Sequence, residues 1–167
     1  MGLNATIEAS IRAKLTAAPD IGSAAYDIET RARYPLTDGV GANQANNVFS
    51  DTRTLAASAS ESIDLAGSLA NVFGVVLTFT AIKAIYVKAA AGNTNDVVIG
   101  GAASNAFVGP FADASDKLAI KPGGCVMLVN PSAAGWTVTP STGDLLLIAN
   151  SAAGTPVSYD IVIIGEA

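Results

Sequence analysis

The chain has 167 residues and a net charge of −5, and its apolar half is rich in small side chains rather than aromatic ones. Folding a chain of this length buries roughly 70% of the surface that its unfolded form exposes. Half of the residues are apolar and only 14% are charged, a balance that excludes a disordered tail. Its basic residues are scattered singly, which argues against a nucleic-acid partner. No apolar stretch approaches the ~20 residues of a membrane helix, so no membrane partner is expected.

The first predicted element is an amphipathic strand over residues 3–15. Apolar side chains at odd positions alternate with polar ones at even positions, the pattern of a two-faced strand. A helix is the competing interpretation, because the larger apolar residues also recur every four positions and alanine favours helices. The β-branched content favours the strand.

A second alternating run, over residues 26–34, follows a turn-like segment at 19–22 and predicts the other half of a hairpin. An antiparallel register exists in which opposite charges face each other at Lys14 and Asp27, at Arg12 and Glu29, and at Glu8 and Arg33. The other face is apolar and needs cover from the body or from another protein. The expected interface consists of Leu3, Ile7, Ile11, Leu15, Tyr26, Ile28 and Tyr34.

A turn-rich link containing Pro35 and residues 39–44 predicts a boundary near residue 45. Residues 1–45 then form an arm with its linker, and residues 46–167 form the body. Strands are expected at 48–57, 60–65, 77–89, 96–99, 117–120, 125–129, 136–139, 145–148 and 157–164, with a helical turn only at 69–72. Many short strands separated by turn-forming residues predict an all-β chain whose body is a β-sandwich or resembles a jelly roll.

The residue types argue against an enzyme. Histidine is absent, which removes the commonest general base and metal ligand. Cys125 lies in an apolar run and is expected to be a small core residue. The carboxylate pairs Asp113 with Asp116 and Asp27 with Glu29 read as a solvated turn and a salt-bridged face. Neither a catalytic residue nor a cofactor or metal site is expected.

Several phrases of the sequence resemble small structural proteins of tailed-bacteriophage virions. They are Asp51–Leu55, Ile63–Leu69, Gly100–Phe107, Ile120–Gly124 and Tyr159–Gly165. The resemblance covers most of the chain and implies a virion component with no functional residue to carry over.

Size, the absence of a fibrous section and the amphipathic hairpin favour a capsid decoration (cement) protein. The expected partners are the major capsid protein of the shell and further copies of the chain, with a trimer favoured. The expected location is the outer capsid surface, after synthesis in the cytoplasm of the host bacterium. A tail or fibre component and a carbohydrate-binding β-sandwich module are the alternatives.

Overall fold

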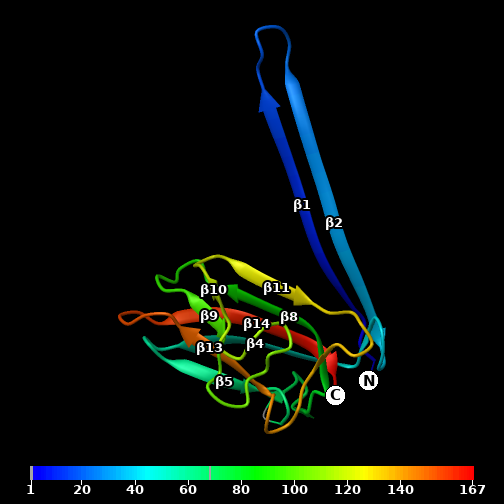
Figure 1. Ribbon diagram of the computed structural model, residues 1–167, viewed down its shortest axis with the longest axis vertical. Coiled ribbons are helices and arrows are strands. Elements are labelled where there is room, and N and C mark those ends of the chain that lie inside the picture. The colour runs from blue at the N-terminus through cyan, green and yellow to red at the C-terminus, as the bar shows by residue number, and fades with distance from the viewer. Residues whose placement is uncertain (1, 68) are drawn as a thin grey trace.

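A computed structural model describes residues 2–67 and 69–167, and all regular structure in these ranges is β (Figure 1). The strands are β1 (Ala5–Ala17), β2 (Ala24–Asp38), β3 (Gln44–Ala45), β4 (Asn47–Leu55), β5 (Ser60–Asp64), β6 (Leu69–Ala70), β7 (Val76–Leu77), β8 (Ala81–Ala89), β9 (Val97–Gly100), β10 (Lys117–Ile120), β11 (Cys125–Val129), β12 (Trp136–Thr137), β13 (Leu145–Asn150) and β14 (Val157–Glu166). The predicted all-β class is confirmed.

The body is a sandwich of two antiparallel sheets. One sheet has the order β11-β8-β14-β4, with β12 also paired to β8, and the other has the order β10-β9-β13-β5. Period-two alternation builds the core between them, as in β14, where Tyr159, Ile161 and Ile163 are buried and Asp160 is exposed. Leu146 of the second sheet is fully buried in the same core.

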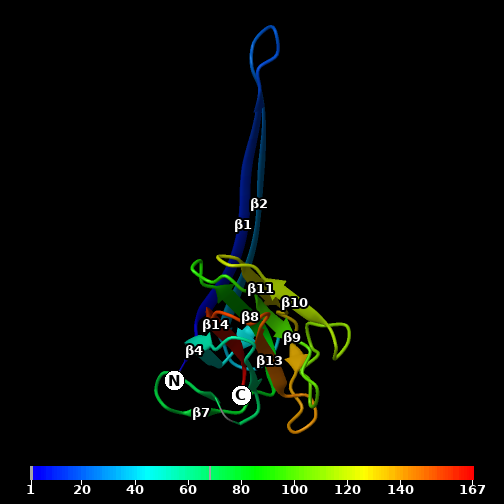
Figure 2. The ribbon, with the colours of Figure 1, turned by 90° about the vertical axis from the view of Figure 1, so that its left-hand side faces the viewer.

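Strands β1 and β2 form a long hairpin that projects away from the sandwich, as two perpendicular views show (Figures 1 and 2). We call this hairpin, residues 5–38, the arm. Its register is the one predicted from charge, with Lys14 opposite Asp27 and Arg12 opposite Glu29. The strand interpretation of residues 3–15 is therefore correct from Ala5 onward, and the helical one is wrong.

Residues 69–72 do not form the expected helical turn. Leu69 and Ala70 belong to β6, which pairs with β7, and the Asn71 side chain closes the connection between the two strands. Its Oδ1 accepts hydrogen bonds from the backbone N–H of Phe73 (3.0 Å) and of Val75 (3.1 Å). A local side-chain hydrogen bond of this kind favours a turn over a helix.

Cys125 is exposed, so the expectation of a buried thiol is wrong. Strand β11 lies at the edge of its sheet, and only Val126 and Leu128 pack against the sandwich core. Alternation turns Cys125 and Met127 to the outer face. The run around Cys125 is apolar on both faces because the arm base covers Met127, as described below.

Candidate functional site

The structure divides the seven predicted interface residues into two groups. Ile7 is buried, with 8% of its surface exposed, and Leu3 and Tyr34 are half-buried around it. The remaining four lie on the projecting part of the arm and are exposed, namely Ile11 (62%), Leu15 (72%), Tyr26 (65%) and Ile28 (44%). Only the base of the apolar row is therefore covered by the chain itself.

The base of the arm packs on the outer face of the first sheet. Ile7 and Leu36 of the arm form a buried cluster with Ala45 and with Ala84 of β8. The half-buried residues around this cluster are Leu3, Ala5, Tyr34, Met127, Val129 and Ile164. This contact explains why the end of β14 is apolar on both faces.

Beyond this cluster the arm diverges from the sheet and leaves an apolar groove, which we call the base groove. It has a volume of about 290 Å³. Its lining consists of Thr6, Ile7 and Glu8 from the arm and Ala84, Ile85, Tyr86, Met127, Val162 and Ile164 from the sheet. The exposed apolar face of the arm thus continues directly into an apolar groove on the body.

The opposite face of the arm carries charged side chains, six of which form ion pairs within the arm. Arg12 bridges Glu29 at 2.8 Å and Lys14 bridges Asp27 at 3.7 Å. The predicted partner of Glu8 was Arg33, which does face it in the register, but the ion pair is made diagonally with Arg31 at 2.5 Å. Diagonal neighbours on a sheet lie within reach of long side chains, which accounts for the difference.

Between residues 8 and 33 the arm carries equal numbers of opposite charges. The acidic residues are Glu8, Asp20, Asp27 and Glu29, and the basic residues are Arg12, Lys14, Arg31 and Arg33. Asp38 lies outside this range, at the junction with the body. Exposed ion pairs of this kind each contribute only about 0–1 kcal/mol, so they fix the register more than they stabilise the arm.

A buried ion pair anchors the linker behind the arm. The Lys83 side chain is fully buried in β8, and its Nζ lies 2.8 Å from Oε1 of Glu166. The same Nζ donates to the carbonyl oxygens of Gly41 (3.1 Å), Ser132 (2.6 Å) and Ala133 (2.9 Å). The Gly41 N–H in turn donates to Glu166 at 2.8 Å. Because every member is hydrogen-bonded, this network fixes the linker to the body.

Sequence reasoning missed this anchor. The available signal was Lys83 itself, a charged residue among the apolar residues of the first half of β8. A buried lysine requires an anionic or carbonyl partner, but nothing in the sequence identifies Glu166 or the Gly41 carbonyl as that partner.

The residues considered for catalysis form no catalytic arrangement. Oδ2 of Asp116 accepts from the backbone N–H of Ala112 (3.1 Å) and Asp113 (2.9 Å), so the pair closes a surface turn. Hydrogen bonds from Ser115 hold the pKa of Asp113 below its usual value. Within residues 2–67 and 69–167, no three acidic or cysteine side chains are grouped so that they could hold a metal ion.

A polar cluster joins the two sheets at the level of β5. The Tyr159 hydroxyl donates to Oε1 of Glu61 at 2.5 Å, and Arg53 bridges both Glu61 and Asp51. Burial and the neighbouring Glu61 carboxylate raise the pKa of Tyr159 well above that of an ordinary tyrosine. Each side chain has a structural partner, so the cluster acts as a tie between β14, β4 and β5.

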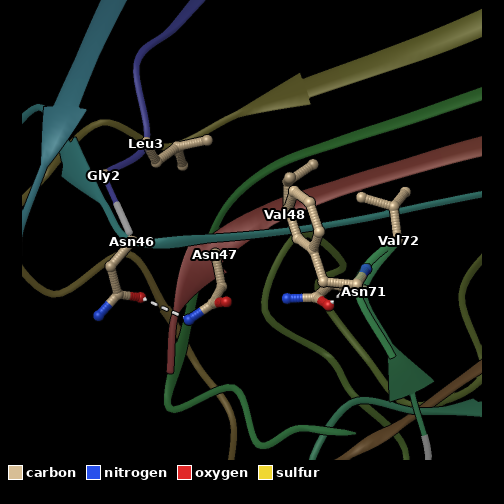
Figure 3. A pocket seen from close by; sticks show the side chains of 8 residues that line it. Gly2, Leu3, Asn46, Asn47, Val48, Asn71 and Val72 are labelled. Atoms are coloured by element: carbon tan, nitrogen blue, oxygen red, sulfur yellow. Dashed lines mark hydrogen bonds between the residues drawn. The ribbon is translucent and has the colours of Figure 1, made fainter. Parts of the chain in front are cut away.

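A smaller pocket of about 100 Å³ lies where the N-terminal segment meets the loop after β6 (Figure 3). Leu3, Val48 and Val72 line it, and Asn47 donates to Oδ1 of Asn46 at 3.2 Å on its rim. None of its lining side chains is ionisable, so it offers no acid, base or nucleophile.

No described segment forms a helix that is long and apolar enough to cross a membrane. Comparison of the chain with protein-family models, with curated proteins and with solved structures finds no match in any of the three.

Proposed function

We propose that the chain is a non-enzymatic structural protein that works by protein–protein contact, with its projecting arm as the docking element. The single observation that carries the proposal is the row of exposed apolar side chains on the arm, headed by Leu15 at 72% exposure. An apolar face on a rigidly anchored projection marks an interaction site. Together with the resemblance to virion proteins, it supports a capsid decoration protein bound to the outside of a phage shell.

The arm needs cover for energetic reasons. A two-stranded ribbon alone is at best marginally stable in water. Burying one large apolar side chain contributes about 1.5–3 kcal/mol, so full cover of Ile11, Leu15, Tyr26 and Ile28 would contribute on the order of 6 kcal/mol or more before the cost of association. Covering these side chains is therefore a favourable contribution that a docked arm gains and a free arm lacks.

The proposed mechanism is linkage. A protein that binds only the assembled state of a shell stabilises that state by its binding free energy. The proposed partners are the major capsid protein and further copies of this chain, on the outer surface of a virion assembled in a bacterial host. The sandwich supplies a rigid body, and no reaction is required.

The test is binding to shells stripped of this protein. The double substitution Ile11→Asp with Leu15→Asp should abolish binding, because each aspartate places an unpaired charge in the docked face. The matched control, Ser10→Asp with Thr16→Asp, adds the same charge to the same strand on the opposite face. Both variants should keep the β-sheet circular dichroism spectrum. Unimpaired shell binding by the first variant would refute the docking role of the arm.

A further inference from the structure

The tip of the arm carries an apolar residue that the docking of one flat face does not explain. Ile21 lies between β1 and β2 and is 92% exposed. An aliphatic side chain at the end of a projection gains nothing there from the chain's own body. At the other end of the arm lies the base groove, whose apolar lining is likewise only partly covered.

The charge balance of the arm is also compatible with packing against a second copy of the arm. Its four acidic and four basic residues between positions 8 and 33 cancel, and three ion pairs engage six of these eight residues within the arm. The rest of the chain carries the whole net charge of −5. Two arms therefore approach without net repulsion, whereas a partner selected by opposite charge would need an unbalanced arm.

We infer that a second copy of this chain covers the arm: the two arms pack antiparallel, apolar face to apolar face, and each Ile21 enters the base groove of the other copy. The inference rests on the proposed function of the arm as a docking element. In this arrangement the arm of a second copy covers the apolar face, the tip and the base groove, and a single two-fold axis relates all three contacts.

The lengths of the elements agree with this arrangement. At ~3.4 Å per residue, the ribbon from Ala9 to Ala17 extends about 27 Å beyond the base. If the tip of one arm reaches the level of Ile7 in the other, the two-fold axis passes near Ala13, which faces Ile28 in the register. A small side chain at the axis allows the two ribbons to approach closely.

The contact area explains why the groove is needed. Two strands ~4.8 Å apart give the free ribbon a footprint of roughly 27 Å by 10 Å, on the order of 270 Å², against ~800 Å² per partner in a standard interface. Face-to-face arms alone fall short of that area. A docked tip at each end extends the contact, and the groove of about 290 Å³ is large enough for an aliphatic side chain.

A parallel arrangement of arms leaves the tips and the base grooves uncovered. Three arms packed side by side around a three-fold axis would cover the apolar faces, but each Ile21 would lie at the common tip, far from every base groove. The antiparallel pair is the arrangement that covers both ends.

The first measurement is the mass of the full chain in solution by sedimentation. We expect a dimer, twice the 16.7 kDa of one chain. Ile21→Asp should weaken the dimer about tenfold or more, because it places a charge in the apolar groove. The control Val76→Asp changes an equally apolar residue, 62% exposed on β7 at the end of the body away from the arm, and should leave the dimer unchanged (Figure 2).

The second measurement is directional cross-linking in a Cys125→Ser background. Ala13→Cys should form a disulfide-linked dimer under mild oxidation, since facing sheets accept such bridges. Lys14→Cys, on the charged face, should not. In a mixture of the two variants, Ile11→Cys should link to Leu15→Cys, because an axis near Ala13 places residue 11 of one copy opposite residue 15 of the other. Neither variant should form a disulfide with a second copy of itself.

The outcomes separate this inference from the proposed function. A monomer at micromolar concentration overturns the inference even if the chain binds shells, in which case the docking role stands. A trimer, or self-linkage of Ile11→Cys, overturns the antiparallel pairing. A dimer with the predicted cross-links that fails to bind shells supports the inference and refutes the shell-binding role.

Discussion

Ile7 and Ile11 lie on the same face of β1, two repeats of the strand alternation apart, yet truncating each of them to alanine should have different effects on stability. Ile7 is 8% exposed at the arm base, whereas Ile11 is 62% exposed on the free ribbon. Truncating a buried isoleucine to alanine costs about 2–5 kcal/mol, depending on how well the site relaxes. The base groove beside Ile7 admits water, so we place Ile7→Ala near the lower end, at about 2–3 kcal/mol.

Ile11→Ala removes few contacts within one chain and should change the free energy of unfolding by no more than about 0.5–1 kcal/mol. The assay is urea unfolding followed by Trp136 fluorescence and circular dichroism, at a concentration where sedimentation shows only monomer. With a urea dependence of ~2 kcal/mol per molar, Ile7→Ala should lower the midpoint by about 1 M and Ile11→Ala by less than half of that.

An equal loss of stability for Ile7→Ala and Ile11→Ala in the monomer would refute the reasoning, because it would mean that the free ribbon folds back onto the body. A negligible effect of Ile7→Ala would show instead that the arm base is not docked. For association we expect the opposite order. Ile11→Ala should weaken binding more than Ile7→Ala does, although it has the smaller effect on the free energy of unfolding.

Three further predictions concern the body. Glu166→Gln should destabilise the fold by about 3–5 kcal/mol, because it leaves the buried Lys83 charge unpaired, and the double variant with Lys83→Met should recover much of that loss in thermal melts. Cys125 should react with a thiol reagent in the folded protein at nearly the rate of the unfolded chain; strong protection would contradict its exposure. The raised pKa of Tyr159 contributes stability that is present below the ordinary tyrosine pKa of 10.0 and is lost as the pH rises further. Urea titrations above pH 10 should therefore show wild type losing stability relative to Tyr159→Phe, and parallel pH profiles would contradict this.

The sequence predicted the arm and most of the strands because period-two alternation and turn residues are local signals. The hairpin register followed from charge alone, since its two strands are adjacent in sequence and carry opposite charges at matching positions. Strands 117–120 and 125–129 coincide with β10 and β11 for the same reason. The boundary near residue 45 stays a prediction.

The sequence could not reveal contacts between distant segments. The Lys83 network joins residues 41, 83, 132, 133 and 166, and no local pattern relates them. Cys125 was placed wrongly because an apolar run does not say which of its faces meets the core. The division of the apolar row between Ile7 and Ile11 was equally hidden, since it depends on where the arm diverges from the sheet.

The position of β14 in the middle of its sheet has a consequence for the order of folding. It pairs with β4 on one side and β8 on the other, and Val157 meets Leu55 across more than half of the chain. The sandwich therefore cannot close until the last strand has left the ribosome, whereas the arm pairs only with its sequence neighbour and can form early. At ~5–20 residues per second, the 119 residues from Asp38 to Val157 take roughly 6–24 s to synthesise. During that interval the apolar strands of the unclosed sandwich and the base of the arm are all uncovered, so chaperone demand in the cell should fall only when β14 has paired with β4 and β8.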